Sequence, residues 1–286
     1  MSERTPDTQQ PAPEGGGLLR IRLRLAYDGT DFAGWAQQPG QRTVQGELTA
    51  AVDAVLRVPE VRVVVAGRTD SGVHALGQVC HFDVPMQAWP GAQAGVRRLN
   101  AVLPADIRVF GADVAPADFD ARFSALWRRY EYLVSDSGRL DPRARHAVLS
   151  QRRALDVEAM HAAAQVLVGE HNFAAFCRAR PGASSVRTIL SLSVMRRADP
   201  RDPQLIVVEI SADAFCHSMV RSVVGALLAV GQGRLTPDGL QDVLAGARRV
   251  PVVATVSAHG LALVDVGYPQ DDLAGRQAVR ARRYRG

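Results

Sequence analysis

Residues 66–75 read Ala66-Gly67-Arg68-Thr69-Asp70-Ser71-Gly72-Val73-His74-Ala75. The β-branched run at residues 61–65 leads into this stretch and is typical of a buried strand. Two glycines then allow tight turns, so the strand stops and polar side chains emerge at its end. Reactive groups are common at such positions. Asp70 is therefore either a catalytic carboxylate or an ordinary turn and cap residue, and spacing alone does not decide between them.

Length and composition indicate a globular protein with more than one domain. The chain has 286 residues, of which 47% are apolar and 22% charged, enough for two domains and a sizeable core. We expect no membrane span, because no apolar run approaches the ~20 residues that one needs. Residues 1–18 are polar and rich in Pro and Gly, which predicts a disordered tail rather than a secretory signal.

The charge balance favours an anionic partner. The net charge is +5 and all 34 basic residues are arginine. A GC-rich coding bias explains this choice, but it has a physical consequence: the guanidinium fork can hold phosphate bidentately and stack on bases. Residues 271–286 form a basic segment that we expect to be a structureless tail, more often a solvated terminus than a phosphate contact.

The cysteines and histidines predict no metal and no disulfide framework. Cys80, Cys177 and Cys216 are odd in number and far apart, which favours a reducing cytoplasm. The seven histidines show no metal-binding spacing such as H-E-x-x-H.

The first half of the chain predicts one βαββαβ unit over residues 19–115. Alternating Leu, Ile and Arg begin it, and an amphipathic helix follows. The expected elements are a strand at 19–26, a helix at 44–57 capped by Thr43, strands at 61–65 and 78–83, a helix at 94–103 and a strand at 107–113.

The second half, residues 116–270, repeats this pattern after a linker at 115–124. We therefore predict an α+β protein with two tandem ferredoxin-like (βαββαβ) domains, antiparallel sheets and an active-site cleft between them. The expected elements are a strand at 127–134, a helix at 156–168, strands at 189–195 and 204–211, helices at 219–230 and 237–245, and a strand at 261–268.

The stretch around Asp70 closely resembles the active-site loop of the TruA-type tRNA pseudouridine synthases, which usually have Ala in place of Ser71. The resemblance implies that Asp70 is the catalytic residue. Arg68 is expected to support the rearranged phosphate backbone of the RNA. Residues 27–35, a Gly-rich turn with aromatics, also resemble the family; Trp35 there could stack on nucleic acid or plug a domain edge.

The run from Phe119 to Tyr132 resembles the family motif F-S-A-x-x-R-x-Y-x-Y. Tyr130 and Tyr132 lie on one face of a strand, where both could be core residues. The resemblance implies that Tyr130 contacts the target nucleoside.

The run from Ala212 to Gly225 resembles the motif F-x-H-x-M-V-R-x-I-V-G. Arg221 interrupts an apolar helix, so it either snorkels at the edge or has a buried partner. The resemblance implies an ion pair with Asp70. Cys216-His217-Ser218 departs from the usual pattern, so no role is assigned to His217. Gly260-Leu261-Ala262-Leu263 resembles the family's G-L-x-L, in which the first Leu, here Leu261, lines the pocket.

Together these motifs imply isomerisation of uridine to pseudouridine at tRNA positions 38, 39 and 40, in the anticodon stem-loop, after base flipping. The implied partner is tRNA, the implied assembly a homodimer, and no cofactor is expected. The main alternative is a non-catalytic RNA-binding protein with an RRM-type fold, although no RNP1 string is present. An Asp-nucleophile phosphotransferase is a second alternative, but further carboxylates near Asp70 are missing from the loop.

Overall fold

The structure, a computed structural model, describes residues 17–178, 182 and 184–285. The predicted disordered tail at 1–18 thus lies almost wholly outside the described residues. The N-terminal half follows the predicted βαββαβ order. Its elements are β1 (Leu18–Tyr27), α1 (Val44–Leu56), β2 (Val64–Val65), β3 (His74–Pro85), the 3-10 turn η1 (Met86–Ala88), α2 (Ala92–Val102) and β4 (Ile107–Ala115).

The C-terminal half repeats this order with added short elements. Every predicted helix and strand of this half is present, with ends that differ by a few residues. Its elements are β5 (Trp127–Ser135), η2 (Pro142–Ala144), β6 (Leu149–Ser150), α3 (Val157–Ala164), η3 (Gln165–Leu167), β7 (Gly169–Asn172), η4 (Phe173–Phe176), β8 (Val186–Asp199), β9 (Asp202–Ala212), α4 (Met219–Gly231), α5 (Pro237–Ala245), β10 (Leu261–Gly267), η5 (Asp271–Leu273) and α6 (Ala274–Arg285).

The strands form one mostly antiparallel sheet, which corrects the prediction of two separate sheets. Within the described residues its order is β4-β1-β3-β10-β5-β9-β8-β7, with β2 on β3 and β6 on β5. The halves join where β10 lies parallel to β3, with Ala262 opposite His74 and Leu263 opposite Ala75. The physical reason is that the short β2 pairs only with Cys80 and His81, so the start of β3 is left as an edge that β10 completes.

A glycine makes this joint possible. A Cβ at Gly77 would lie 2.3 Å from the carbonyl oxygen of Val264 in β10, so no larger residue fits. The strand that contains Gly77 also begins earlier than predicted, at His74 instead of residue 78, because pairing with β1 and β10 extends it into the predicted loop.

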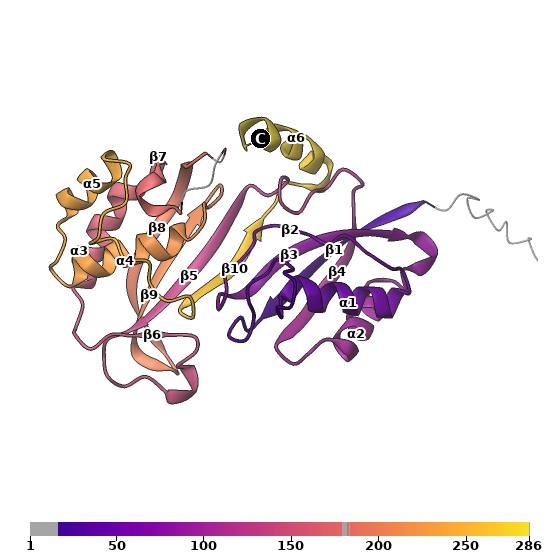
Figure 1. The fold of residues 1–286 in the computed structure, drawn as a ribbon, viewed down its shortest axis with the longest axis horizontal. Coiled ribbons are helices and arrows are strands. Elements are labelled where there is room, and N and C mark those ends of the chain that lie inside the picture. The colour runs from indigo at the N-terminus through magenta and orange to yellow at the C-terminus, as the bar shows by residue number, and fades with distance from the viewer. Residues whose placement is uncertain (1–16, 179–181, 183, 286) are drawn as a thin grey trace, which may run out of the picture.

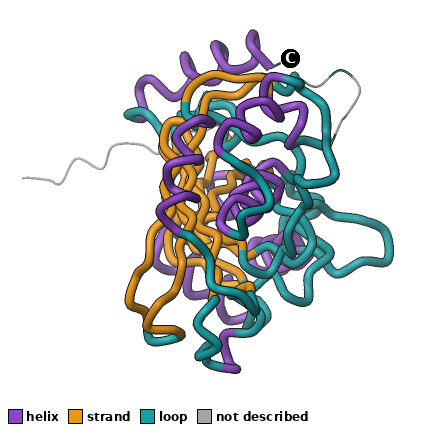
Figure 2. The backbone as a smooth tube through the Cα atoms, turned by 90° about the vertical axis from the view of Figure 1, so that its left-hand side faces the viewer, coloured by secondary structure: helices purple, strands orange, loops and turns teal. Residues whose placement is uncertain are grey.

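Helices cover the sheet in both halves. Figure 1 shows α1 and α2 over the N-terminal half and α3, α4 and α5 over the C-terminal half. Figure 2 shows the strands in one layer, with most helices and loops on one side of it. Thr43 caps α1 by accepting a hydrogen bond from the Gly46 N–H at 3.2 Å, as predicted. In α4 every residue except Arg221 is buried.

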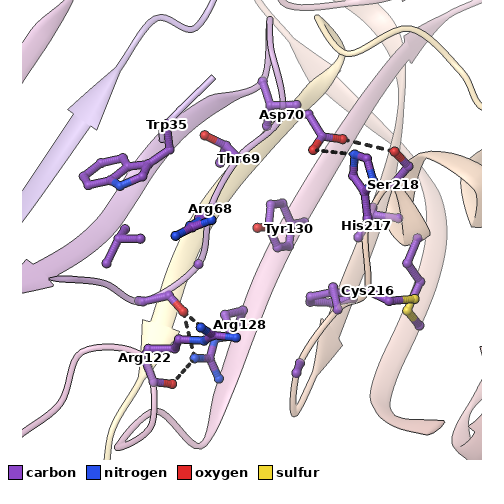
Figure 3. Close-up of a pocket in the computed structure, with 18 of the residues that line it drawn as sticks. Trp35, Arg68, Thr69, Asp70, Arg122, Arg128, Tyr130, Cys216, His217 and Ser218 are labelled. Carbon is purple, nitrogen blue, oxygen red and sulfur yellow. Dashed lines mark hydrogen bonds and ion pairs between the residues drawn. The ribbon is translucent and has the colours of Figure 1, made fainter. Parts of the chain in front are cut away.

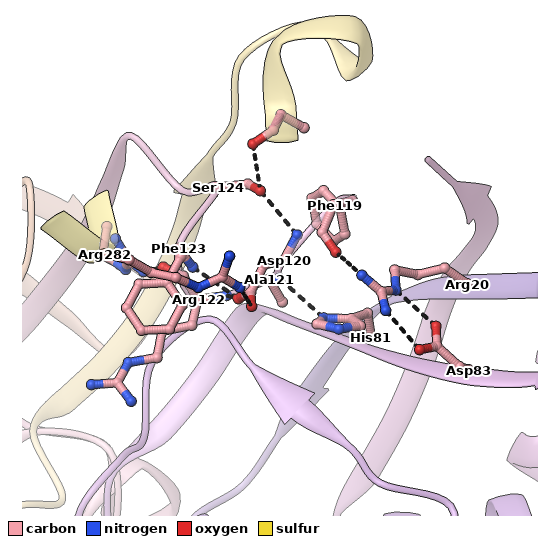
Figure 4. A network of polar contacts seen from close by, with 12 residues as sticks. Arg20, His81, Asp83, Phe119, Asp120, Ala121, Arg122, Phe123, Ser124 and Arg282 are labelled. Carbon is pink, nitrogen blue, oxygen red and sulfur yellow. Dashed lines mark hydrogen bonds and ion pairs between the residues drawn. The ribbon is translucent and has the colours of Figure 1, made fainter. Parts of the chain in front are cut away.

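The C-terminal segment is not structureless, which corrects the prediction of a structureless tail. Residues Asp271–Leu273 form η5 and Ala274–Arg285 form α6. The buried face of α6 consists of small residues, Ala274, Gly275, Ala278 and Ala281. In the sequence these residues alternate with arginines, so the stretch resembles a solvated basic tail. This face packs on the segment between β4 and β5, where Ser124 Oγ donates to the Ala274 carbonyl at 2.8 Å (Figure 4).

Candidate functional site

The Asp70 loop is fastened on several sides to the N-terminal half. The backbone N–H of Trp35 donates to the Thr69 carbonyl at 3.1 Å. The Thr69 hydroxyl lies 2.8 Å from the Tyr27 hydroxyl. Gln78 Nε2 donates to the Gly67 carbonyl at 2.9 Å. Trp35 itself is only 1% exposed, which supports the plugging alternative over base stacking.

His74, at the end of this loop, ties it to the C-terminal half. Its Nδ1 accepts a hydrogen bond from the Gly29 N–H at 3.0 Å. Its Nε2 lies 2.7 Å from the His146 carbonyl and 3.0 Å from the His259 carbonyl. These contacts fix the loop between both halves of the molecule.

The Asp70 carboxylate faces the start of α4 rather than its own turn. Its Oδ2 lies 3.2 Å from Ser218 Oγ and 3.4 Å from Arg221 Nη1, and its Oδ1 lies 3.4 Å from His217 Nε2. Figure 3 shows Asp70, His217 and Ser218 together on one side of the cavity. Among the described residues, the side-chain partners of the carboxylate thus come from one helix terminus, where the positive end of the helix dipole favours an anion.

Arg221 is held in position by a second contact, because its Nε donates to the Val256 carbonyl at 2.8 Å. Its side chain is 20% exposed. The contact with Asp70 at 3.4 Å is longer than an ideal charge-assisted hydrogen bond. Arg221 therefore has a partner across the cavity, as one of the two alternatives required, and does not snorkel at the helix edge.

All five site residues predicted from the sequence line one cavity, which has a volume of about 790 Å³. The volume is typical of a small-molecule or nucleotide site. The parallel β3–β10 joint brings the start of β10 beside the Asp70 loop, across the boundary between the halves. The five residues that the fold brings together are Asp70, Arg68, Tyr130, Arg221 and Leu261.

Tyr130 offers an aromatic surface in the cavity (Figure 3). It is 7% exposed, and its ring meets that of Phe215 edge-on at 5.1 Å. Burial raises the pKa of the Tyr130 phenol well above its usual value, so the side chain is neutral at any working pH. Its neighbour on the same face, Tyr132, is fully buried and donates to the Ser257 carbonyl at 2.8 Å. Leu261, 5% exposed, closes the apolar part of the wall.

The cavity wall is strongly basic. Among the described residues that line it are seven arginines and two aspartates. Arg68 is exposed in the middle of the wall. The excess of positive charge suits a ligand with phosphates. The seven are Arg62, Arg68, Arg122, Arg128, Arg187, Arg221 and Arg282.

Arg128 has a structural position that the sequence reasoning missed. Its side chain, 5% exposed, donates to the carbonyl of Ala66 at 2.8 Å, to that of Asp213 at 2.9 Å and to that of Arg122. It therefore links the Asp70 loop, the loop before α4 and the segment between β4 and β5. The sequence did contain a sign of this role, because Arg128 is the Arg of the F-S-A-x-x-R-x-Y-x-Y motif.

His217 and Ser218 were also given no role from the sequence, yet both contact Asp70. Ser218 has a positive φ of 62°, which is uncommon for a residue other than glycine and often marks a functional site. Nothing in the local sequence signals that conformation.

One cysteine prediction is wrong. The structure joins Cys177 and Cys216 in a disulfide, with Cα atoms 5.7 Å apart. The two are 39 residues apart in sequence, and the fold brings the end of η4 next to the start of α4, which sequence separation could not reveal. The argument for a reducing compartment from unpaired cysteines therefore no longer holds.

Among the described residues, no group of three or more His, Cys, Asp or Glu side chains could hold a metal ion. Nor does any helix in the described ranges have the length and apolarity to cross a membrane. Around Asp70 the cavity presents a carboxylate with a cation, an imidazole and a hydroxyl beside it, and a neutral phenol ring nearby.

Comparison with known proteins gives consistent matches. The profile described as tRNA pseudouridine synthase matches residues 25–124 and 163–269. A tRNA pseudouridine synthase A from Frankia casuarinae is 56% identical over 265 residues, covering 92% of this chain and 94% of the relative. Proteins of the same name from Streptomyces avermitilis and Mycobacterium leprae are 49% and 46% identical, over 94% and 92% of this chain and 95% and 94% of the relatives.

Proposed function

Because the chain belongs to the tRNA pseudouridine synthase family, we propose that it isomerises uridines 38, 39 and 40 in the anticodon stem-loop of tRNA, with Asp70 as the catalytic residue. The observation that carries the proposal is the Asp70 carboxylate, held beside Arg221 in a basic cavity. A module that only binds RNA would have no use for this constellation.

The reaction breaks the bond from C1′ to N1, turns the uracil over and joins C5 to C1′. No atoms are gained or lost, so neither a redox cofactor nor ATP is needed. Three first steps are open to the carboxylate: attack on C1′, attack on C6, or removal of a proton from C2′. All three place Asp70 at the same point beside the nucleoside.

The other cavity residues bind and orient the substrate. A uridine in a stem must leave the stack, at a cost of a few kcal/mol, and stacking on the Tyr130 ring offsets part of that cost. Arg221 orients the Asp70 carboxylate through the contact at 3.4 Å. Arg68 contacts the displaced phosphate backbone, and Leu261 packs against the extruded base.

Three further points of the proposal concern the whole protein. The N-terminal half has the order β4-β1-β3-β2, and the four longer strands of the C-terminal half have the matching order β10-β5-β9-β8. This supports two ferredoxin-like units fused through β10. Resemblance to the family supports a homodimer, and a monomeric mass in light scattering at working concentration would contradict it. The tRNA substrate supports a cytoplasmic location.

The test is tritium release from tRNA that carries [5-³H]uridine, since forming the new C5 bond frees that hydrogen. We expect release from an anticodon stem-loop with uridines at 38–40 and none when cytidines replace them. Release from the replaced substrate would contradict the assigned positions. RNA binding without any release would favour the non-catalytic alternative.

A further inference from the structure

The C-terminal helix α6 presents arginines on the face opposite its buried one. Arg276, Arg280 and Arg283 recur at helical spacing and are all exposed. With a rise of about 1.5 Å per residue they form a stripe about 10 Å long. Across the described ranges no carboxylate forms an ion pair with any of the three, whereas Arg282 on the flank is paired with Asp120 at 2.7 Å.

The helix is a rigid support for this stripe. Its alanine face is buried, and Ser124 fastens its first turn. At the other end, the Phe123 ring lies between two guanidinium groups, that of Arg282 at 4.9 Å and that of Arg122 at 5.0 Å. Figure 4 shows this stack beside Asp120. Exposed arginines on an ordered helix lose less conformational freedom on binding than those on a mobile tail.

The stripe is continuous with the site. Arg282 lines the Asp70 cavity and also a second hollow of about 560 Å³ on the flank of α6. That hollow is bordered by Arg20 and Arg276 on the basic side and by Asp118 on the acidic side. A path of guanidinium groups therefore leads from the cavity across Arg282 to the outer face of the helix.

We propose that α6 is a phosphate-binding element for the RNA backbone outside the modified nucleotide, with Arg276, Arg280 and Arg283 contacting phosphates. This rests on the proposed function, because it takes tRNA as the ligand. The chemistry fits: a sequence-independent row of positive groups positions a nucleic acid without reading its bases. The three arginines act on affinity and not on the isomerisation step.

The test compares tRNA binding and single-turnover tritium release for the wild type and the triple variant Arg276→Gln, Arg280→Gln, Arg283→Gln. We expect the variant to bind tRNA about tenfold more weakly or worse near 0.15 M salt, with a slope of log K against log[salt] smaller by about 2. Release at saturating tRNA should stay within about twofold, because the cavity is unchanged.

Two further variants make the result specific. Replacing the same three residues by lysine keeps the charge and should restore the salt dependence. A matched control, Arg97→Gln, Arg98→Gln, Arg108→Gln, removes the same charge from α2 and β4, where α2 lies at the far side of the molecule from α6 (Figure 1), and should bind like the wild type.

The inference is overturned if the glutamine variant keeps the salt dependence of the wild type. It is also overturned if the lysine variant loses as much affinity as the glutamine variant, or if the α2 control does. A wild type that binds tRNA but releases no tritium would contradict the proposed function instead, and the binding comparison would still decide the role of α6.

Discussion

At the scale of single residues, Asp70 depends on groups that reach it from the other half of the chain. Arg221 is the charged one of these, and it is oriented by the Val256 carbonyl. The sequence predicted Arg221 and Asp70 as partners through the family motif. It could not predict that Ser218 adopts a left-handed backbone and joins them, because nothing in the local sequence signals that conformation.

The first prediction concerns Arg221. Arg221→Gln should lower kcat at least about tenfold with little change in KM, because it removes a positive charge that acts on Asp70 and not on the bound RNA. Arg221→Lys should lose less, since it keeps the charge but not the fork. Steady-state kinetics of tritium release check this. A KM raised about tenfold with unchanged kcat would show that Arg221 only binds substrate.

The second prediction concerns Arg128, a positioning residue that touches three loops through their carbonyls. Arg128→Lys should leave some of these buried carbonyls without donors, at roughly 1–3 kcal/mol for each. We expect a lower melting temperature and a kcat reduced about tenfold, because the Ala66 carbonyl anchors the Asp70 loop.

Arg97→Lys on the exposed face of α2 is the control for Arg128→Lys and should change neither quantity. A destabilised Arg128 variant with wild-type kcat would mean that the residue is purely structural.

At the scale of elements, periodicity predicted α1, α4 and α5 well because each carries a clear apolar face or end signal. It failed for α6, whose buried face is made of alanines that are indistinguishable from a solvated basic tail. It also missed that β10 completes the edge of β3, because edge pairing depends on contacts far apart in sequence.

The third prediction concerns how β3 holds the segment between β4 and β5. The Nδ1 atom of His81 accepts a hydrogen bond from the Ala121 N–H at 3.0 Å. Burial, and next the charge of Arg20, lower the pKa of His81 from 6.5 to about 4. The folded state therefore binds a proton at His81 less readily than the unfolded chain does. The stability that the neutral His81 side chain contributes is complete above pH 6.5 and is lost as the pH falls towards 4.

Over that range the free energy of unfolding should fall by up to about 3 kcal/mol through this residue. His81→Asn keeps an acceptor but cannot titrate, so the variant should lose that part of the fall. Urea unfolding between pH 4 and 7 measures the difference. Parallel curves for the two proteins would show that His81 is not the cause.

At the scale of the whole molecule, one sheet runs through both halves, so the site is built across a joint and not in a gap between independent domains. The fourth prediction follows: heating should unfold the chain in a single calorimetric transition, with equal calorimetric and van't Hoff enthalpies.

Gly77→Ala, which places a Cβ against the Val264 carbonyl, should weaken the joint and separate the transition into two. Two resolved transitions in the wild type would contradict the view that β10 couples the halves.

The central claim is that Asp70 performs the isomerisation while the surrounding basic surface binds the tRNA. The most direct measurement is tritium release from [5-³H]uridine tRNA by Asp70→Asn, alongside tRNA binding, with Asp242→Asn on α5 as the control. We predict no release by Asp70→Asn with tRNA affinity within about threefold of the wild type, and full release by Asp242→Asn. Release that survives in Asp70→Asn would contradict the account.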